Sequence, residues 1–167
     1  MSGWLTERIE PNKDLGQHFL TDPAICRRIV HFAGVSCDDI VLEIGPGTGQ
    51  LTTELLAAAG QVIVIEVDPK LIPLLRARWS GDKAERLRII EGDILRVPLD
   101  EILPCTGIRL VANLPYNIAT AVIKKMTKAS DWFHSLTMMV QREVANRILA
   151  PCDNRNHGYF SLFAQFH

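Results

Sequence analysis

Hydrophobic residues follow two alternating patterns along the chain. Short apolar runs of the length of a buried strand alternate with longer segments in which apolar residues recur at helical spacing. The predicted strands are residues 41–44, 62–65, 87–90, 108–112, 136–140 and 159–166, and the predicted helices are residues 23–33, 51–59, 69–79, 119–128 and 143–149. Strands that alternate with helices predict an α/β fold with a doubly wound, mainly parallel sheet.

The most informative segment joins the first predicted strand to its helix. Gly45, Gly47 and Gly49 allow a tight turn there, because glycine has no side chain to clash. A strand, a glycine turn and a helix form the first half of a nucleotide-binding unit. Glu66 ends the next predicted strand, about twenty positions later, where an acidic residue can accept hydrogen bonds from a ribose.

The exact glycine spacing narrows the class of nucleotide. A dinucleotide site has a third glycine at the position that Gln50 holds here, and a phosphate-binding P-loop has a lysine, which does not follow this turn. Glu43, in the first predicted strand, also argues against a phosphate nearby. These features favour a nucleoside cofactor without phosphates, such as S-adenosylmethionine (SAM). A dinucleotide-dependent oxidoreductase stays open as an alternative.

Polar residues follow two further predicted strands. In a parallel sheet, ligands bind at the carboxyl ends of the strands. Asp93 follows the third strand and can accept a hydrogen bond from an adenine amine, and Asn113 follows the fourth. Pro115 restrains the backbone after Leu114. Tyr116 offers a flat face on which a flipped base can stack.

Composition limits the classes of function. The 167 residues suit one domain, and no apolar run reaches the length of a membrane span. The four cysteines are far apart, which predicts reduced thiols in a cytoplasmic protein and no metal site. From residue 109 onward there are 7 basic against 3 acidic residues, an asymmetry that could attract RNA. A solvated basic helix around residues 124–128 explains the same charge equally well.

Six segments resemble those of the ribosomal RNA adenine N6,N6-dimethyltransferases, which use SAM. They occur in the family's order: residues 16–20 (GQHFL), 43–52 (EIGPGTGQLT), 66–68 (EVD), 92–93 (GD), 113–117 (NLPYN) and 141–145 (QREVA). The NIAT sequence at residues 117–120 is more similar to the small-subunit enzymes than to the antibiotic-resistance relatives that modify large-subunit rRNA. The resemblance implies dimethylation of two adjacent adenosines in small-subunit rRNA, with a pre-30S-type particle as partner and a role in ribosome biogenesis.

The resemblance also implies a role for each matching position. His18 and Leu20 would lie over the methionine end of SAM, although His18 could act through its backbone alone. The remaining cofactor contacts would come from the turn and from three strand ends. They would be Gly45 and Gly47 in the glycine turn, Glu66 at the ribose, Asp93 at the adenine, and Asn113 after the fourth strand. The catalytic segment would be Asn113, Leu114, Pro115 and Tyr116. Carbonyl groups of its first two residues would accept the hydrogens of the target amine, and Tyr116 would stack on the base.

The family continues beyond the matched segments with another strand and a helical C-terminal domain. Residues 1–167 are therefore expected to form the catalytic domain, with a sheet that lacks its last strand. The apolar strand predicted at residues 160–166 would then have an open edge, which could pair with a second copy of the chain. A non-catalytic RNA-binding or ribosome-assembly module is a further alternative.

Overall fold

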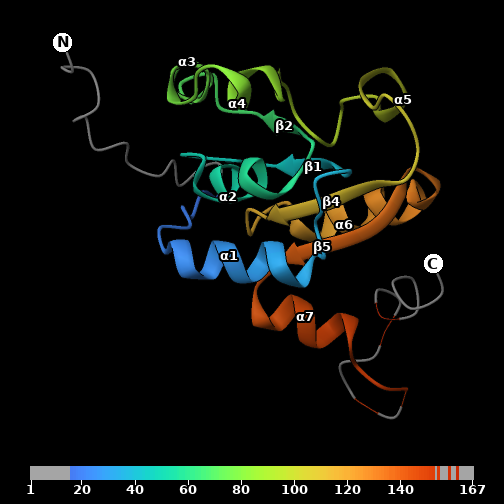
Figure 1. Cartoon of the computed structure of the whole chain (residues 1–167). Helices are drawn as coiled ribbons and strands as arrows, with labels where there is room; N and C mark the ends of the chain where they lie inside the picture. Colours follow the sequence, from blue (N-terminus) through green and yellow to red (C-terminus); the bar gives the residue numbers. More distant parts are fainter. Residues whose placement is uncertain (1–15, 153, 155–157, 159–160, 162–167) are drawn as a thin grey trace.

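Five parallel strands form a single sheet in the computed structural model, which describes residues 16–152, 154, 158 and 161 (Figure 1). The strand order is β3-β2-β1-β4-β5. The strands are β1 (Ile40–Ile44), β2 (Gln61–Glu66), β3 (Leu87–Glu91), β4 (Ile108–Asn113) and β5 (Phe133–Met139). All four neighbouring pairs are parallel, which confirms the predicted α/β class.

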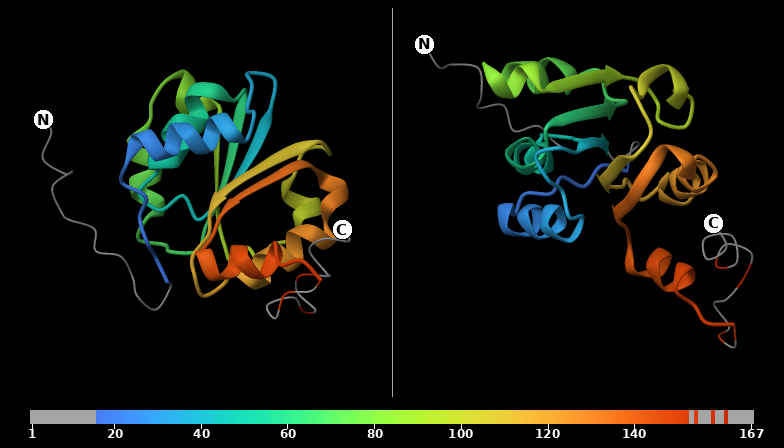
Figure 2. Two further views of the ribbon diagram at one scale, coloured as in Figure 1. Left: turned by 90° about the horizontal axis from the view of Figure 1, so that it is seen from below. Right: turned by 45° about the vertical axis from the view of Figure 1, so that its right-hand side comes forward.

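Helices lie on both sides of this sheet (Figure 2). They are α1 (Pro23–Phe32), α2 (Gln50–Ala58), α3 (Ile72–Arg78), α4 (Asp82–Glu85), α5 (Leu99–Ile102), α6 (Ala119–Lys128), the 3-10 helix η2 (Ser130–Trp132) and α7 (Arg142–Ile148). Successive strand residues point to opposite faces of a sheet. Val41 accordingly packs in the cluster formed with α1 and α2, whereas Leu42 and Ile44 pack in the cluster formed with α5 and α6. Burial on both faces explains why the strands are apolar runs rather than alternating patterns.

The predicted helix boundaries hold where a cap fixes them. Asp22 accepts a hydrogen bond from the Ala24 amide (2.8 Å), and Pro23 opens α1 as predicted. The prediction that Pro69 opens the next helix is wrong, because α3 begins at Ile72. Asp68 accepts hydrogen bonds from the amides of Lys70 and Leu71, and these form a turn before the helix.

The short helix α4 and the start of β5 also differ from the predictions. Helix α4 lies between the helix predicted at residues 69–79 and the strand predicted at residues 87–90, where no helix was predicted, and β5 begins three residues earlier than predicted. Of the strand predicted at residues 159–166, only Ser161 is described, and it is helical; the open edge and its pairing with a second copy lie outside the described residues. Within the described part of the chain, no helix is long and apolar enough to cross a membrane.

Candidate active site

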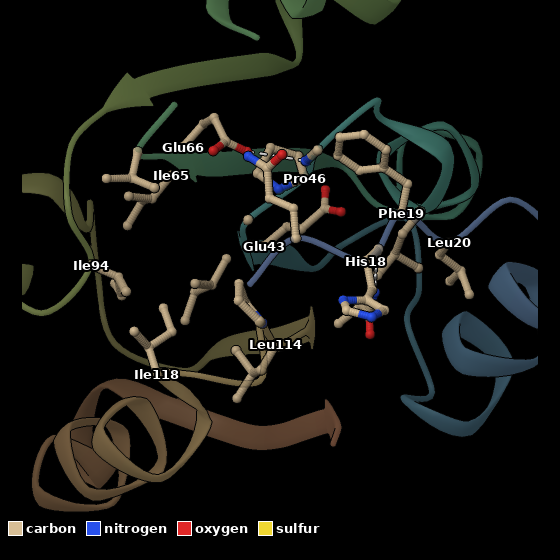
Figure 3. Close-up of a pocket in the computed structure, with 18 of the residues that line it drawn as sticks. His18, Phe19, Leu20, Glu43, Pro46, Ile65, Glu66, Ile94, Leu114 and Ile118 are labelled. Carbon is tan, nitrogen blue, oxygen red and sulfur yellow. Dashed lines mark hydrogen bonds between the residues drawn. The ribbon is translucent and has the colours of Figure 1, made fainter. Parts of the chain in front are cut away.

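A cavity lies at the carboxyl ends of the strands, near the place where the chain changes direction between β1 and β4 (Figure 3). Such a switch point is where open α/β sheets bind ligands. Nine of the ten predicted site residues line it: His18, Leu20, Gly45, Gly47, Glu66, Asp93, Asn113, Leu114 and Pro115. The sequence therefore placed residues from four strand ends and one loop correctly around a single cavity. The tenth, Tyr116, is not among the lining residues.

Glu66 holds the glycine turn against the end of β2. Its carboxylate accepts hydrogen bonds from the backbone amides of Gly47 (3.1 Å) and Asp68 (3.0 Å), and the residue is only 3% exposed. Burial raises the pKa of this carboxyl, while the backbone hydrogen bonds oppose the rise. Each carboxylate oxygen can accept more than one hydrogen bond, so the group can still bind a ligand.

Gly47 is required for steric reasons. Its φ is +57°, a conformation that side chains disfavour, and an added Cβ would lie 2.9 Å from the ring of Phe19. The turn and the N-terminal segment can approach each other only because this position has no side chain.

Glu43 and Thr52 form a buried polar pair beneath the turn. The Thr52 hydroxyl donates to Glu43 Oε2 at 2.6 Å, and Glu43 is 1% exposed. Burial raises the pKa of Glu43 to about 8, so this carboxyl is largely protonated at neutral pH. In the sequence, Glu43 was only an argument against phosphate, and Thr52 ended the matching segment 43–52 without any expected role.

Residues 16–20, here called the N-terminal strap, lie beside the ends of three strands. Gln17 donates to Asp68 after β2 (3.1 Å), and Phe19 lies against Gly47 after β1. At β4, the His18 carbonyl accepts a hydrogen bond from the side-chain amide of Asn113 (3.2 Å). Gln17 and Phe19 also line the cavity, but they were not predicted as site residues.

The contact with the strap fixes the orientation of the Asn113 amide. A carbonyl oxygen can only accept a hydrogen bond, so the amide nitrogen must face His18 and Oδ1 must point elsewhere. The chain after Asn113 is held by a bond from the Leu114 amide to the Met139 carbonyl (3.1 Å). Asn113 thus presents an oriented acceptor at a cavity that it lines.

Tyr116 lies next to the His18 ring. The two ring centroids are 4.3 Å apart with an interplanar angle of 40°, and Tyr116 is 42% exposed. His18 lines the cavity, whereas Tyr116 is not among the residues that line it. The His18 side chain contacts Tyr116 through its ring and the Gly16 carbonyl through Nδ1 (3.4 Å), and its backbone carbonyl contacts Asn113.

Asp93 is the second residue of the loop of residues 92–98, here called the Asp93 loop. Its Oδ1 accepts from the Leu95 amide (2.9 Å), and its backbone carbonyl accepts from the amides of Arg96 and Val97. Oδ2 lies 3.6 Å from the Arg96 guanidinium. The loop lines the cavity through Gly92, Asp93 and Ile94, on the side away from the N-terminal strap.

The basic charge of the later part of the chain is less available than its sequence indicated. Arg109 Nε lies 2.9 Å from Asp39 Oδ2, and its Nη1 donates to the Ala33 carbonyl. Lys125 donates to two backbone carbonyls. The alternative of a solvated basic helix therefore describes the exposed Lys128 but does not describe Lys125.

The described residues contain no group of histidine, cysteine and acidic side chains placed to hold a metal ion. All four cysteines are free, and only Cys26 is buried.

Comparison with known proteins identifies the family. The model of the ribosomal RNA adenine dimethylase family matches residues 9–167. The chain belongs to this family. A ribosomal RNA small subunit methyltransferase A from Geobacter sulfurreducens is 41% identical over 162 residues, which are 95% of this chain and 58% of that protein. The protein of the same name from Clostridium perfringens is 43% identical over 157 residues, 93% of this chain and 54% of its own length.

Solved structures agree with this dimethylase fold. A dimethyladenosine transferase from Plasmodium falciparum has a TM-score of 0.78 at 32% identity and covers 89% of this chain and 52% of that one. The 23S rRNA methyltransferase ErmE has a TM-score of 0.67 at 33% identity and covers 78% of this chain and 50% of its own. The chain thus spans a little over half the length of the curated relatives that it matches.

Proposed function

We propose that this chain is the catalytic domain of a SAM-dependent enzyme that dimethylates the N6 amines of two adjacent adenosines in small-subunit rRNA. Its partner would be an assembling small-subunit particle of the pre-30S type in the cytoplasm. The observation that carries the proposal is the oriented amide of Asn113 at a cavity that also contains Glu66 and Asp93. Family membership supports the reaction class, and two curated relatives carry the name of a small-subunit rRNA methyltransferase.

The donor set of the cavity fits SAM. One carboxylate ends β2 and another follows β3. Glu66 would bind the ribose hydroxyls, and Asp93 the adenine amine. Gly45 and Gly47, with φ of +67° and +57°, keep side chains out of the turn where the methionine end would lie beside His18 and Leu20. When bound, SAM supplies an electrophilic methyl group on a sulfonium.

The chain's own part in the reaction is to position the target amine. The lone pair of an adenine amine is delocalised into the ring, which makes the nitrogen a poor nucleophile. Oδ1 of Asn113 and the backbone carbonyl of Leu114 would accept its two hydrogens and favour a tetrahedral nitrogen. These acceptors are oriented before the substrate arrives, so catalysis would come from positioning and from fixed dipoles.

Tyr116 would hold the flipped base by stacking. Its ring is exposed and lies within 4.3 Å of His18, so the base would enter where these two rings meet. No general base of matched pKa is needed, because the proton released from the amine can pass to water.

The test is transfer of radiolabelled methyl groups from SAM to unmodified small-subunit rRNA, both naked and in particles. We expect labelled N6,N6-dimethyladenosine at two adjacent positions of the small-subunit RNA. Label in large-subunit rRNA would instead support an enzyme of the antibiotic-resistance type. Binding of rRNA without any labelled product would support a non-catalytic assembly module.

A further inference from the structure

Lys125 makes two short hydrogen bonds that its place on a basic helix did not predict. Its ammonium group donates to the Ile94 carbonyl (2.7 Å) and to the Val97 carbonyl (2.6 Å). Both carbonyls belong to the Asp93 loop, whose own amides fold back onto Asp93. One cation therefore holds the loop at two points, on either side of its turn.

The side chain is partly buried, and this has an energetic cost. Burial lowers the pKa of Lys125, and the charge of Asp93 acts in the opposite direction. A lysine also loses considerable rotamer freedom when its ammonium is held in one place. Its two hydrogen bonds are of the charge-assisted kind, which are stronger than neutral ones and can offset these costs. A solvated surface lysine would have no such arrangement.

Lys125 does not line the cavity itself, so any effect on a ligand must pass through the loop. The loop contributes Gly92, Asp93 and Ile94 to the cavity wall. Helix α6, which carries Lys125, begins shortly after the segment of residues 113–116 that contains the proposed target-amine acceptors. The lysine thus connects the helix that follows the proposed target-amine acceptors with the loop that carries Asp93.

We propose that Lys125 is a positioning residue that holds the Asp93 loop in the shape required to bind the adenine of the cofactor. This inference rests on the proposed function, because it takes Asp93 as the adenine contact. The role differs from that of a basic residue on an RNA-binding surface, since both hydrogen bonds of the Lys125 ammonium go to carbonyl groups of the protein's own backbone.

The first test needs no ligand. Lys125→Met removes the ammonium group and keeps an unbranched apolar stem. We expect amide hydrogen exchange at Leu95, Arg96 and Val97 to become about tenfold faster, the change expected from losing hydrogen bonds to a charged group. Exchange at Leu110 and Val111 in β4 should stay unchanged. A parallel rise at those two positions would show general destabilisation and would overturn the inference.

The second test measures binding by calorimetry with S-adenosylhomocysteine and with 5′-methylthioadenosine, which lacks the amino acid part. Lys125→Met should weaken both by the same factor, about tenfold, because the change lies on the adenine side. Lys125→Arg keeps the cation and should bind with intermediate affinity. Lys128→Met, on the exposed part of the same helix, is the matched control and should bind like the native chain.

The outcomes separate this inference from the proposed function. If the native chain binds both ligands and Lys125→Met binds them with the same affinity, the role of Lys125 is overturned and the proposed function stays in place. A loss confined to S-adenosylhomocysteine would place the effect on the methionine side and would also overturn it. Failure of the native chain to bind either ligand would count against the proposed function, while the exchange experiment would still decide whether Lys125 holds the loop.

Discussion

The two halves of the cavity differ in how far they are formed without a ligand. On the β1 and β2 side, Glu43 and Glu66 are 1% and 3% exposed, and both carboxyls already accept hydrogen bonds from the protein. On the β4 side, Tyr116 is 42% exposed, and the Asn113 side chain is held by a bond to the His18 carbonyl. In the first half the two carboxyls are buried and held by hydrogen bonds, whereas the second half has an exposed aromatic ring beside it.

This difference matches the two ligands proposed for the site. A small cofactor binds best in a cavity whose polar groups are already placed, because little conformational freedom is then lost on binding. A base that belongs to a large RNA must enter from outside, so its half of the site has to be accessible. The comparison predicts that changes in the first half affect cofactor affinity and fold stability, and that changes in the second affect methyl transfer and the use of RNA.

The largest effect is expected at Asn113. Asn113→Ala removes a preoriented acceptor, so methyl transfer should fall by on the order of a hundredfold or more. Affinity for SAM by calorimetry should stay close to that of the native chain. Asn146→Ala, on the exposed face of α7, is the control and should transfer methyl groups normally. A large loss of SAM affinity in Asn113→Ala would break the division into two halves.

Glu43 should make the fold sensitive to pH. Burial raises its pKa in the folded chain to about 8, from an ordinary value of 4.5. The folded state therefore binds the extra proton between these values, and its free energy of unfolding should decrease as the pH rises through this window. The slope from one such group is at most about 1.4 kcal/mol per pH unit.

Urea unfolding of the ligand-free chain between about pH 5 and 8 measures this slope. Glu43→Gln keeps the shape and removes the titration, so its stability should depend less on pH than that of the native chain. The raised pKa of Glu66 acts in the same direction and should leave a residual slope in the variant. Identical pH dependence in both proteins would mean that Glu43 is not protonated in the folded state.

Glu66 should contribute mainly to cofactor affinity. Glu66→Ala should weaken SAM binding by roughly 1–3 kcal/mol, the cost of losing hydrogen bonds to a charged acceptor. Calorimetry can compare it with Glu91→Ala, because Glu91 pairs with Glu66 in the neighbouring strand but is exposed. Unchanged affinity in Glu66→Ala would refute its assignment to the ribose.

The sequence was most informative at positions whose structural role depends only on residues nearby in the chain. Gly47 could be recognised because only glycine fits its turn, and Asp22 and Pro23 because they mark a helix start by themselves. Parallel strands bring their carboxyl ends together, so Glu66, Asp93 and Asn113 could be placed around one cavity before the structure was known.

What the sequence could not show were contacts between residues far apart in the chain. The bond from Asn113 to the His18 carbonyl spans 95 positions, and the bond from Lys125 to Ile94 spans 31. Lys125 and Lys128 look alike in sequence, and only packing separates a partly buried cation from an exposed one. The start of α3 was missed because the side chain of Asp68 stabilises a turn that competes with the helix.

An effect no larger than that of Glu66→Ala is expected at Tyr116, and it separates the two halves most sharply. Tyr116→Ala removes the stacking face, which is worth about 1–3 kcal/mol, so use of rRNA should weaken by roughly tenfold or more. Tyr116→Phe keeps the ring and should differ little from the native chain. Since the ring is exposed and does not line the cavity, SAM affinity should not change in either variant. Steady-state methyl transfer at varied rRNA concentration, with calorimetry of SAM as control, measures both quantities. If Tyr116→Ala used rRNA as well as the native chain does, the base would not stack on this ring, and the β4 side of the cavity would need another explanation.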